Sequence, residues 1–450
     1  MSANWTEHPL EKLCSEITVG HVGSMTKEYR DNGIPFFRSK NIREHRIDWD
    51  DVKYVSHGFH QKLKKSILRP GDVAVVRTGK PGAACVIPDY VAEANCSDLV
   101  IMRVDPQLLS PYFLSYYLNS VANHQINSSL VGAVQQHFNV GAAKKLAITI
   151  PGRKEQDGIV KIVKDLDDKI QLNHQINQTL EQMAQALFKS WFVDFEPVKA
   201  KIALRERWQA LQPENEPASP VCYAAELDEP PALGDLETYM NRAAMQAISG
   251  KTAEQLDALR TEDPERYEEL FETAALFPSA MQESELGEIP EGWEPSTVGK
   301  EFDVTMGQSP PGDTYNETGE GTPFFQGRRD YGKRFPSNRV YCTQPKRMAK
   351  RGDTLLSVRA PVGDTNIALT DCCIGRGLVA IRHKSGCSSF TYYSVIQLGH
   401  ELSSYDSEGT VFGSINQKNL KGISQLAPPH EVRRSQVPSA TLLKGARSSD

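Results

Sequence analysis

The chain of 450 residues carries the same domain twice, and this repeat limits the folds open to it more than any other feature. The segment Ile34–Phe37 returns as Thr322–Phe325, 288 residues later. The turn Gly71–Asp72 returns as Gly352–Asp353, at an offset of 281. Because the order is kept and the offset drifts slowly, we interpret the pattern as one duplicated domain of about 140 residues. Further matched positions are Trp5 and Trp293, Leu99–Arg103 and Leu378–Arg382, Asn139 and Asn416, and Pro151 and Pro428.

Composition indicates a globular protein outside membranes. Hydrophobic residues make up 39% and charged residues 24%, which is ordinary for a folded domain. The first ten residues are polar, and no apolar run approaches the length of a membrane span. The eight cysteines are scattered without a C-x-x-C pair, which favours free thiols over a zinc site. We therefore expect a cytoplasmic protein of two or three domains.

Each copy is predicted to be a mixed α+β domain with a curved or barrel-like sheet. The β-branched runs at Asp72–Val76 and Leu146–Ile150 are typical of strands. Tyr112–Val121 is predicted to be a helix, with Ser110 as its N-cap and Pro111 at its first position. The fold class predicted is therefore α+β, with two tandem repeated domains separated by a long coiled-coil helix.

After Pro151 the apolar period changes from strand-like to helical. A heptad seam runs for about 40 residues, which corresponds to a helix about 60 Å long. Such a helix is longer than one small domain needs for cover, so the pattern favours a coiled coil. The alternative is a surface helix packed on its own domain. The seam consists of Ile159, Val163, Leu166, Ile170, Asn173, Asn177, Leu180, Ala184, Leu187 and Trp191.

The remaining boundaries follow from composition. Residues 213–292 contain 19 acidic and 4 basic side chains, and they follow a proline-rich start. We expect a variable, partly disordered acidic spacer that contains a helical piece at about 253–275. The predicted domains are 1–152 for the first repeated domain, 153–195 for the helix, 196–290 for the spacer, 291–429 for the second repeated domain, and 430–450 for the tail.

The net charge of −6 hides strongly basic segments. From Arg328 to Arg351 nine Lys or Arg side chains accompany the single acidic residue Asp330. Local basic density of this kind attracts phosphate groups. The alternative for one such segment is a solvated charged face, but the first copy is also basic at the matching place.

The sequence lacks the common motifs of catalysis. No G-x-x-x-x-G-K-[ST] phosphate loop, H-E-x-x-H zinc motif or amino-methyltransferase signature occurs. This pattern favours a binding protein without catalysis of its own. Two other classes remain open: a self-contained nuclease or methyltransferase, and a coiled-coil scaffold that binds only proteins.

Three polar loops recur at matched places in the two copies. They carry Arg, Lys, Asn and Gln, the side-chain types that read base edges in the major groove. The first follows the Pro-Phe-Phe segment, the second precedes Gly82 or Gly363, and the third precedes the last strand. Each loop alone could be an ordinary polar turn. Together they indicate one scaffold with two specificities. The candidate DNA-binding residues are Arg38, Lys40, Asn41, Arg43, Arg77, Lys80, Gln135 and Gln136 in the first copy, and Gln326, Arg328, Arg329, Arg359, Asn416 and Gln417 in the second.

The ordered set of segments resembles the specificity (S) subunit of Type I restriction-modification enzymes from Met1 to about Arg434. Asp165–Ile170 and Leu187–Phe195 are similar to the central helical region of that family, and Glu283–Pro290 with Trp293 is similar to the entry into its second recognition domain. The resemblance implies that each globular domain recognises half of a bipartite, asymmetric site in double-stranded DNA. It also implies an antiparallel coiled coil that fixes the spacing. Methyltransferase (M) subunits would dock on the helices, restriction and motor (R) subunits would join them, and S-adenosylmethionine, ATP and Mg would be bound by those partners rather than by this chain.

The C-terminal segment departs from that family pattern. A second helix is expected after Pro428, but residues 435–450 contain no heptads. Two consequences are expected as alternatives: an inactive truncated subunit whose helix stays on a methyltransferase partner, or a self-dimer through the central helix. Such a dimer would have two-fold symmetry and favour a symmetric DNA site.

Overall fold

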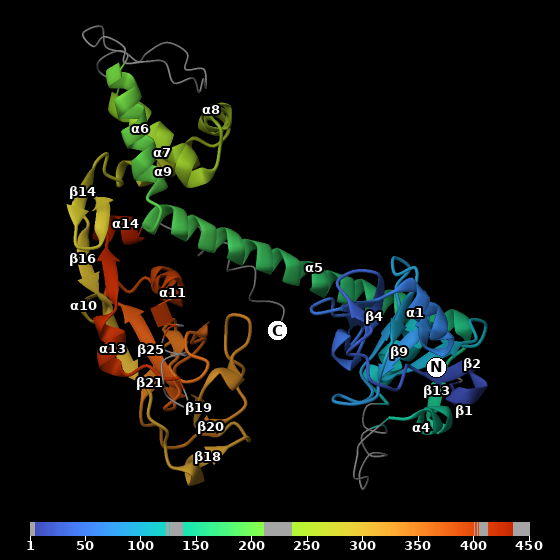
Figure 1. Cartoon of the computed structure of the whole chain (residues 1–450). Coiled ribbons are helices and arrows are strands. Elements are labelled where there is room, and N and C mark those ends of the chain that lie inside the picture. The colour runs from blue at the N-terminus through green and yellow to red at the C-terminus, as the bar shows by residue number, and fades with distance from the viewer. Residues whose placement is uncertain are drawn as a thin grey trace. The chain divides into compact units, whose positions relative to one another are not determined.

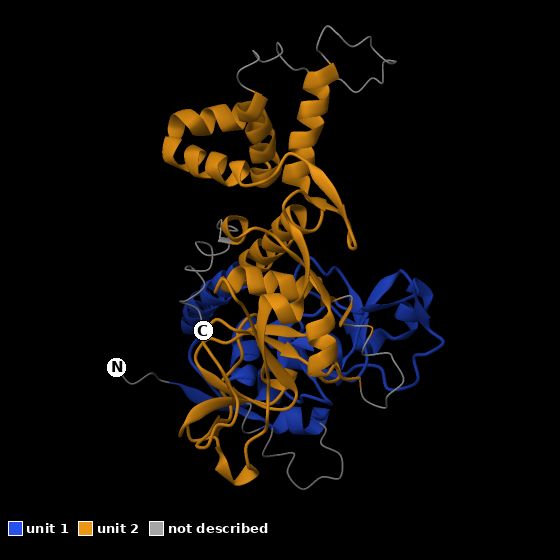
Figure 2. Cartoon of the chain, turned by 90° about the vertical axis from the view of Figure 1, so that its left-hand side faces the viewer, with its two compact units in different colours: residues 1–173 blue, residues 174–450 orange. Residues whose placement is uncertain are grey.

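A computed structural model describes residues 5–122, 126, 138–210, 236–399, 401–402, 404 and 413–434 (Figure 1). The chain divides into two compact units, residues 1–173 and 174–450, which Figure 2 shows in blue and orange. Gln135, Gln136 and the tail 435–450 lie outside the described residues, so the expectations placed on them stay predictions.

Unit 1 contains a four-stranded sheet and a five-stranded one. The first has the order β10-β9-β12-β2 and the second the order β3-β7-β4-β11-β8, while β1 pairs with β13. The bounds are β1 Thr6–Pro9, β2 Cys14–Val19, β3 Tyr29–Arg30, β4 Ile34–Phe37, β7 Lys53–Val55, β8 Ile67–Leu68, β9 Val73–Val76, β10 Ala84–Val86, β11 Ala94–Cys96, β12 Leu99–Val104 and β13 Ala147–Ile150. The pair β5 (Ile42–Arg43) and β6 (Arg46–Ile47) forms a short hairpin.

Strand β9 is apolar throughout because both of its faces are covered. Val73 and Val75 point into a cluster with Phe113 of α2 (Pro111–Asn119), whereas Ala74 and Val76 point into a cluster with Phe37. Alternate residues of a strand face opposite sides, so an all-apolar strand requires two such layers. The Ser110 hydroxyl accepts a hydrogen bond from the Phe113 amide at 3.4 Å, which confirms the predicted helix start.

Unit 2 repeats this topology strand by strand. Its sheets have the orders β17-β25-β22-β23 and β18-β20-β19-β24-β21, and β16 pairs with β26. The parallel pair of unit 1, β4 with β11, returns as β19 with β24. The bounds are β16 Glu294–Thr297, β17 Phe302–Met306, β18 Tyr315–Asn316, β19 Thr322–Phe325, β20 Tyr341–Cys342, β21 Met348–Ala349, β22 Thr354–Ser357, β23 Thr365–Ile367, β24 Cys372–Ile374, β25 Leu378–His383 and β26 Ser424–Ala427. The predicted α+β fold with a duplicated domain is therefore confirmed.

The repeated Gly-Asp turn is part of the scaffold. Gly71 and Gly352 have φ angles of 86° and 85°, a region that glycine enters without a side-chain clash. The carboxylate of Asp72 accepts a hydrogen bond from the Arg69 amide at 3.0 Å, and Asp353 accepts one from the Lys350 amide at 2.7 Å. Each aspartate also pairs with an arginine of a nearby strand: Arg103 lies 3.4 Å from Asp72, and Arg382 lies 2.6 Å from Asp353.

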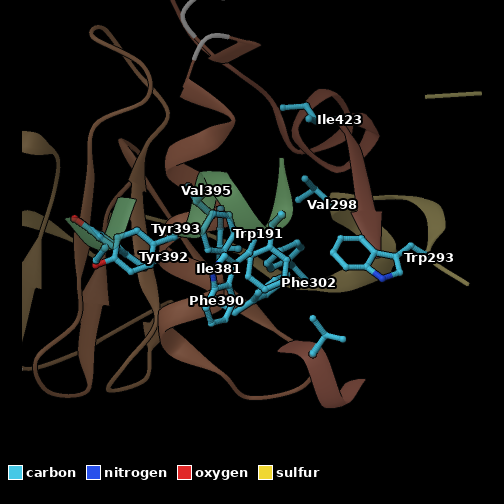
Figure 3. Packing of buried hydrophobic residues seen from close by; sticks show 14 of the residues in the cluster. Trp191, Trp293, Val298, Phe302, Ile381, Phe390, Tyr392, Tyr393, Val395 and Ile423 are labelled. Carbon is cyan, nitrogen blue, oxygen red and sulfur yellow. The ribbon is translucent and has the colours of Figure 1, made fainter. Parts of the chain in front are cut away.

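The long helix α5 (Arg153–Phe192) is continuous over 40 residues, and its buried side chains lie near its two ends. In unit 1 the buried amide of Gln156 bonds to the Ser110 amide and to the Leu108 and Pro151 carbonyls, and Ile159 packs on the core. In unit 2 Ala184, Phe188 and Trp191 are buried in the large cluster that also holds Trp293 (Figure 3). Between these ends Leu166 and Ile170 remain 58% and 47% exposed.

The expected seam is therefore covered unevenly. Val163, Asn173, Leu180 and Leu187 are partly exposed, and Asn177 is exposed. The alternative of a helix packed on its own domains is confirmed for its two ends, and the coiled coil stays a prediction for the middle.

The acidic spacer is more ordered than the sequence indicates over its described part. It contains α6 (Glu196–Ala210), α7 (Leu236–Ser249), α8 (Ala253–Glu262) and α9 (Pro264–Ala275), followed by a hairpin of β14 (Met281–Ser284) and β15 (Gly287–Pro290). The helical piece predicted at 253–275 is confirmed, with a break at Asp263. Met245, Ile248, Leu256 and Phe277 are buried in the unit 2 cluster. The expectation of a partly disordered spacer is therefore wrong for residues 236–290. The composition misleads here because the acidic surface residues outnumber the few apolar residues that form the core.

The remaining helices are short and lie beside the sheets. They are α1 (His57–Lys62), α4 (Val140–Lys145), α10 (Val298–Glu301), α11 (Ser388–Gln397), α13 (Gln417–Gly422) and α14 (His430–Arg434). Short 3-10 turns follow β4 at Ser39–Asn41 and β19 at Arg328–Asp330.

Candidate nucleic-acid interface

The three loops predicted from the sequence meet in unit 1 through a chain of main-chain hydrogen bonds. The Ser97 amide donates to the Phe37 carbonyl at 3.0 Å, at the end of β4. The Arg77 amide donates to the Asp98 carbonyl at 3.4 Å, and the Phe138 amide donates to the Arg77 carbonyl at 3.1 Å. The loop after β4, the loop after β9 and the segment before α4 are thus joined through the turn between β11 and β12.

Unit 2 contains the same chain of bonds at matched positions. The Gly375 amide donates to the Phe325 carbonyl at 2.8 Å, and the Val358 amide donates to the Gly377 carbonyl at 2.9 Å. The Ile415 amide then donates to the Val358 carbonyl at 3.1 Å. Both copies therefore gather their three loops by one main-chain arrangement that does not depend on the loop side chains.

Asn41 is a structural residue of the first loop, which corrects its assignment as a DNA-binding residue. Its side chain is completely buried. Its Oδ1 accepts from the Arg38 amide at 3.1 Å, and its Nδ2 lies 3.2 Å from both the Asp48 and the Asp50 carbonyl. A buried amide with these partners has no free edge for a base.

A cluster of three cations surrounds one carboxylate in the same loop. Lys40, Lys53 and Arg38 all form ion pairs with Asp51: the Lys53 Nζ lies 2.6 Å from Oδ1 and the Arg38 guanidinium 3.3 Å from Oδ2. The hydrogen bonds from the two lysines hold the pKa of Asp51 far below its usual range. The four side chains remain between 22% and 50% exposed, so the cluster lies at the surface.

The other candidate DNA-binding residues of unit 1 either pair with a carboxylate or are partly buried. The Arg43 Nε lies 3.1 Å from Asp48, and the Lys80 Nζ lies 2.6 Å from Glu44. Arg77 is partly buried, and its Nε has no hydrogen-bond partner among the described residues. Lys80 and Arg43 are well exposed and remain suitable for contact with DNA.

In unit 2 the first loop presents an exposed row of polar side chains. Gln326, Arg328 and Arg329 are exposed, and the Arg328 Nε lies 2.9 Å from Asp364 in the turn after β22. A surface hollow of about 470 Å³ lies beside this pair, lined among others by Lys333 and Tyr392. The first and second loops of unit 2 therefore share one surface.

The second and third loops of unit 2 have the counterparts that the bonding pattern assigns. Val358 is the counterpart of Arg77, because it occupies the matched place in the chain of bonds. Arg359, the next residue, is exposed. Asn416 is the N-cap of α13 and accepts from the Asn419 amide at 2.9 Å, as Asn139 does for α4 from the Ala142 amide at 2.9 Å. Asn416 thus has a structural role at its Oδ1, and Gln417 beside it is exposed.

Two exposed aromatic residues adjoin the first loop of unit 1 and were missed in the sequence. Trp49 is 43% exposed and packs edge-on against Phe37, with ring centroids 5.5 Å apart. Tyr90 is 75% exposed and lies 6.4 Å from Trp49 between ring centroids. The signal available was an aromatic residue inside an otherwise polar loop, next to the basic cluster.

A partly buried ion pair links α5 to the basic segment of unit 2 and was also missed. The Arg334 guanidinium pairs with Glu181 and lies over the Tyr392 ring, 4.7 Å from its centroid. Burial acts to lower the pKa of Arg334, but the hydrogen bond with Tyr393 and the charge of Glu181 hold it above its usual value. Arg334 is therefore a scaffold residue within a segment that looks uniformly DNA-binding in sequence.

The described residues show neither a metal cluster nor a helix suited to a membrane. They contain no group of three or more His, Cys, Asp or Glu side chains arranged to hold a metal ion. In the same part of the chain, no helix has both the length and the apolar character needed to cross a membrane.

Comparison with known proteins gives consistent similarities. The family model of the Type I restriction modification DNA specificity domain matches residues 11–182. The protein named as the putative MjaX type I restriction enzyme specificity subunit of Methanocaldococcus jannaschii is 26% identical over 443 residues, covering 96% of this chain and 85% of that protein. The type I restriction enzyme HindI specificity subunit of Haemophilus influenzae is 34% identical over 273 residues, covering 58% and 54%. The solved structure of the HsdS subunit from Thermoanaerobacter tengcongensis is 22% identical, with a TM-score of 0.31 over 99% of this chain and 92% of that one.

Proposed function

Since this chain belongs to the family of type I restriction enzyme specificity subunits, we propose that it selects the DNA sequence on which partner subunits act. In this proposal unit 1 and unit 2 each read one half of a bipartite, asymmetric site. Methylation and cleavage are then carried out by methyltransferase and restriction subunits, which bind S-adenosylmethionine, ATP and Mg.

One observation carries the proposal. The two units share strand order and the chain of main-chain bonds that gathers three loops, yet the exposed side chains on those loops differ. A repeated scaffold with unlike polar side chains is what two different half-sites require. The described candidates that are exposed are Lys40, Arg43 and Lys80 in unit 1, and Gln326, Arg328, Arg329, Arg359, Asn416 and Gln417 in unit 2.

The middle of α5 supports a further part of the proposal. Ile162, Leu166 and Ile170 are 65%, 58% and 47% exposed, an apolar stripe that another helix would cover. We propose a methyltransferase subunit as the covering partner, with a second copy of the chain as the alternative. Light scattering of the purified chain, alone and with its methyltransferase subunit, separates these two assemblies.

The test of the function is a comparison of DNA methylation in cells with and without this chain. The expected result is one bipartite motif that is methylated only when the chain is present. An unchanged methylation pattern, together with no binding to double-stranded DNA at low salt in the presence of the methyltransferase, would support a protein-only scaffold instead. We also propose the cytoplasm as the place of action, supported by the seven described cysteines, which are all free thiols.

A further inference from the structure

The cluster of Arg38, Lys40, Lys53 and Asp51 has the composition of an occupied anion site. Three cations from two segments, one after β4 and one at the start of β7, converge on the two oxygens of one carboxylate. Three positive charges around one negative charge leave an excess of two at the surface. An ordinary surface ion pair has no such excess.

The backbone fixes the cluster in place. Asp51 has a φ angle of 53°, in the left-handed region that Asp and Asn enter more readily than other side-chain-bearing residues. The buried Asn41 amide ties the Arg38 amide to the Asp48 and Asp50 carbonyls, so both sides of the loop are held together. The cations are therefore positioned before any ligand arrives.

We propose that this cluster is a phosphodiester-binding site of the DNA interface and that the Asp51 carboxylate occupies it in the free protein. A carboxylate and a backbone phosphate each present two oxygens that share a single negative charge, and both are recognised by Arg and Lys through charge-assisted hydrogen bonds. This inference rests on the proposed function. Asp51 acts here as an intramolecular competitor that DNA must displace.

The competition has a consequence for specificity. Every duplex offers phosphates, so an unoccupied cation cluster would strengthen binding to all sequences alike. Because the Asp51 carboxylate must first be displaced, only a duplex that gains additional contacts elsewhere binds tightly. The displacement cost lowers the affinity for random DNA and for the target by the same factor, and the target compensates for it through its base contacts.

The decisive variant is Asp51→Asn in the full-length chain with its methyltransferase subunit. Asn has nearly the same shape and tolerates the left-handed backbone, so thermal unfolding should be unchanged. We expect affinity for a random-sequence duplex, measured by fluorescence anisotropy, to rise about tenfold. The slope of log affinity against log salt should steepen by about one, since about one more phosphate is neutralised.

Asp157→Asn is the matched control for Asp51→Asn. Asp157→Asn removes the same charge from an exposed pair with Arg153 at the start of α5, outside the three loops, and should change affinity less than about twofold. If Asp51→Asn weakens binding as Lys40→Ala does, or leaves it unchanged, Asp51 only organises the cations and the inference is wrong. If the wild-type complex binds no duplex even at low salt, the proposed function itself fails.

Discussion

Arg38, Lys40 and Arg43 all lie beside carboxylates of their own loop, a pairing that the sequence did not predict. Polar residues after a Pro-Phe-Phe segment predict a loop that can reach a ligand. They do not show which of them is buried, because burial depends on contacts such as those of Asn41 with Asp48 and Asp50. Residue type predicted a polar, basic loop, and tertiary contacts determine which of its side chains are buried and which are exposed.

Replacing Asn41 with Ala should destabilise unit 1. The variant would leave the Arg38 amide and the Asp48 and Asp50 carbonyls without their buried partner, at a cost of about 1–3 kcal/mol. Thermal unfolding of Asn41→Ala should therefore begin at a lower temperature than that of the wild type. Lys40→Ala, at an exposed neighbour, is the control and should leave unfolding almost unchanged. Equal unfolding of the two variants would mean that Asn41 has no structural role and could again be considered for DNA binding.

His383 should make the stability of unit 2 depend on pH in the acid range. Burial, together with the neighbouring Arg433, lowers its pKa from 6.5 to about 4. The unfolded chain then binds a proton at a higher pH than the folded one, so this contribution to stability is present above pH 6.5 and is lost as the pH falls toward 4. The free energy of unfolding should decrease by at most about 1.4 kcal/mol per pH unit in that window. In the His383→Gln variant the free energy of unfolding should depend less on pH in this window. An unchanged pH dependence would mean that carboxylates, not His383, cause it.

At the scale of elements, periodicity predicted α5 and the Ser110 cap, whereas composition misled for the acidic spacer. A heptad stripe over 40 residues has few alternatives in secondary structure. The periodicity does not predict what the stripe packs against. Ile159 and Trp191 lie in the same stripe as Leu166 but pack on the chain's own domains. The spacer was misjudged because Leu256 and Phe277 are sparse among carboxylates and bury against residues distant in sequence.

Lengthening α5 should change the distance between the two recognised half-sites. A seven-residue insertion between Leu166 and Asn173 keeps the heptad phase and adds about 10 Å of helix. The gap between half-sites should grow by roughly three base pairs, at about 3.4 Å each. Sequencing of methylated sites measures that gap directly. The same seven residues placed in the turn between β14 and β15 are the control and should not alter it, and an unchanged gap for the α5 insertion would mean that α5 does not set the spacing.

At the scale of the whole chain, duplication was visible in the sequence because shared motifs kept their order. Gly71–Asp72 and Gly352–Asp353 keep their identity since each forms the same turn and the same pair with an arginine. The loops are less visible by residue type, because Val358 makes the main-chain bonds equivalent to those of Arg77 without resembling arginine. Residue type therefore identifies the shared turns more readily than the equivalent loop positions.

Substitutions in one unit should affect one half-site alone. Arg328 and Arg329 lie on the first loop of unit 2, so replacing both with Ala should weaken binding to the target by about 1–3 kcal/mol for each base that these arginines recognise. The weakening should appear as relaxed recognition in one half of the methylated motif. Arg43→Ala in unit 1 is the matched variant and should relax the other half. Equal weakening on random duplexes would show that these arginines contact phosphates only.

The main-chain bonds that gather the loops also bear on how new specificities can arise. Since Phe138 and Ile415 donate to carbonyls of Arg77 and Val358, the loop geometry survives with an arginine or a valine at the same place. Exposed side chains of these loops can therefore change while the loop geometry is kept, whereas Val358 itself is buried in the core of unit 2. On the proposed function, selection can then act on the DNA target of one unit while the other unit stays constant.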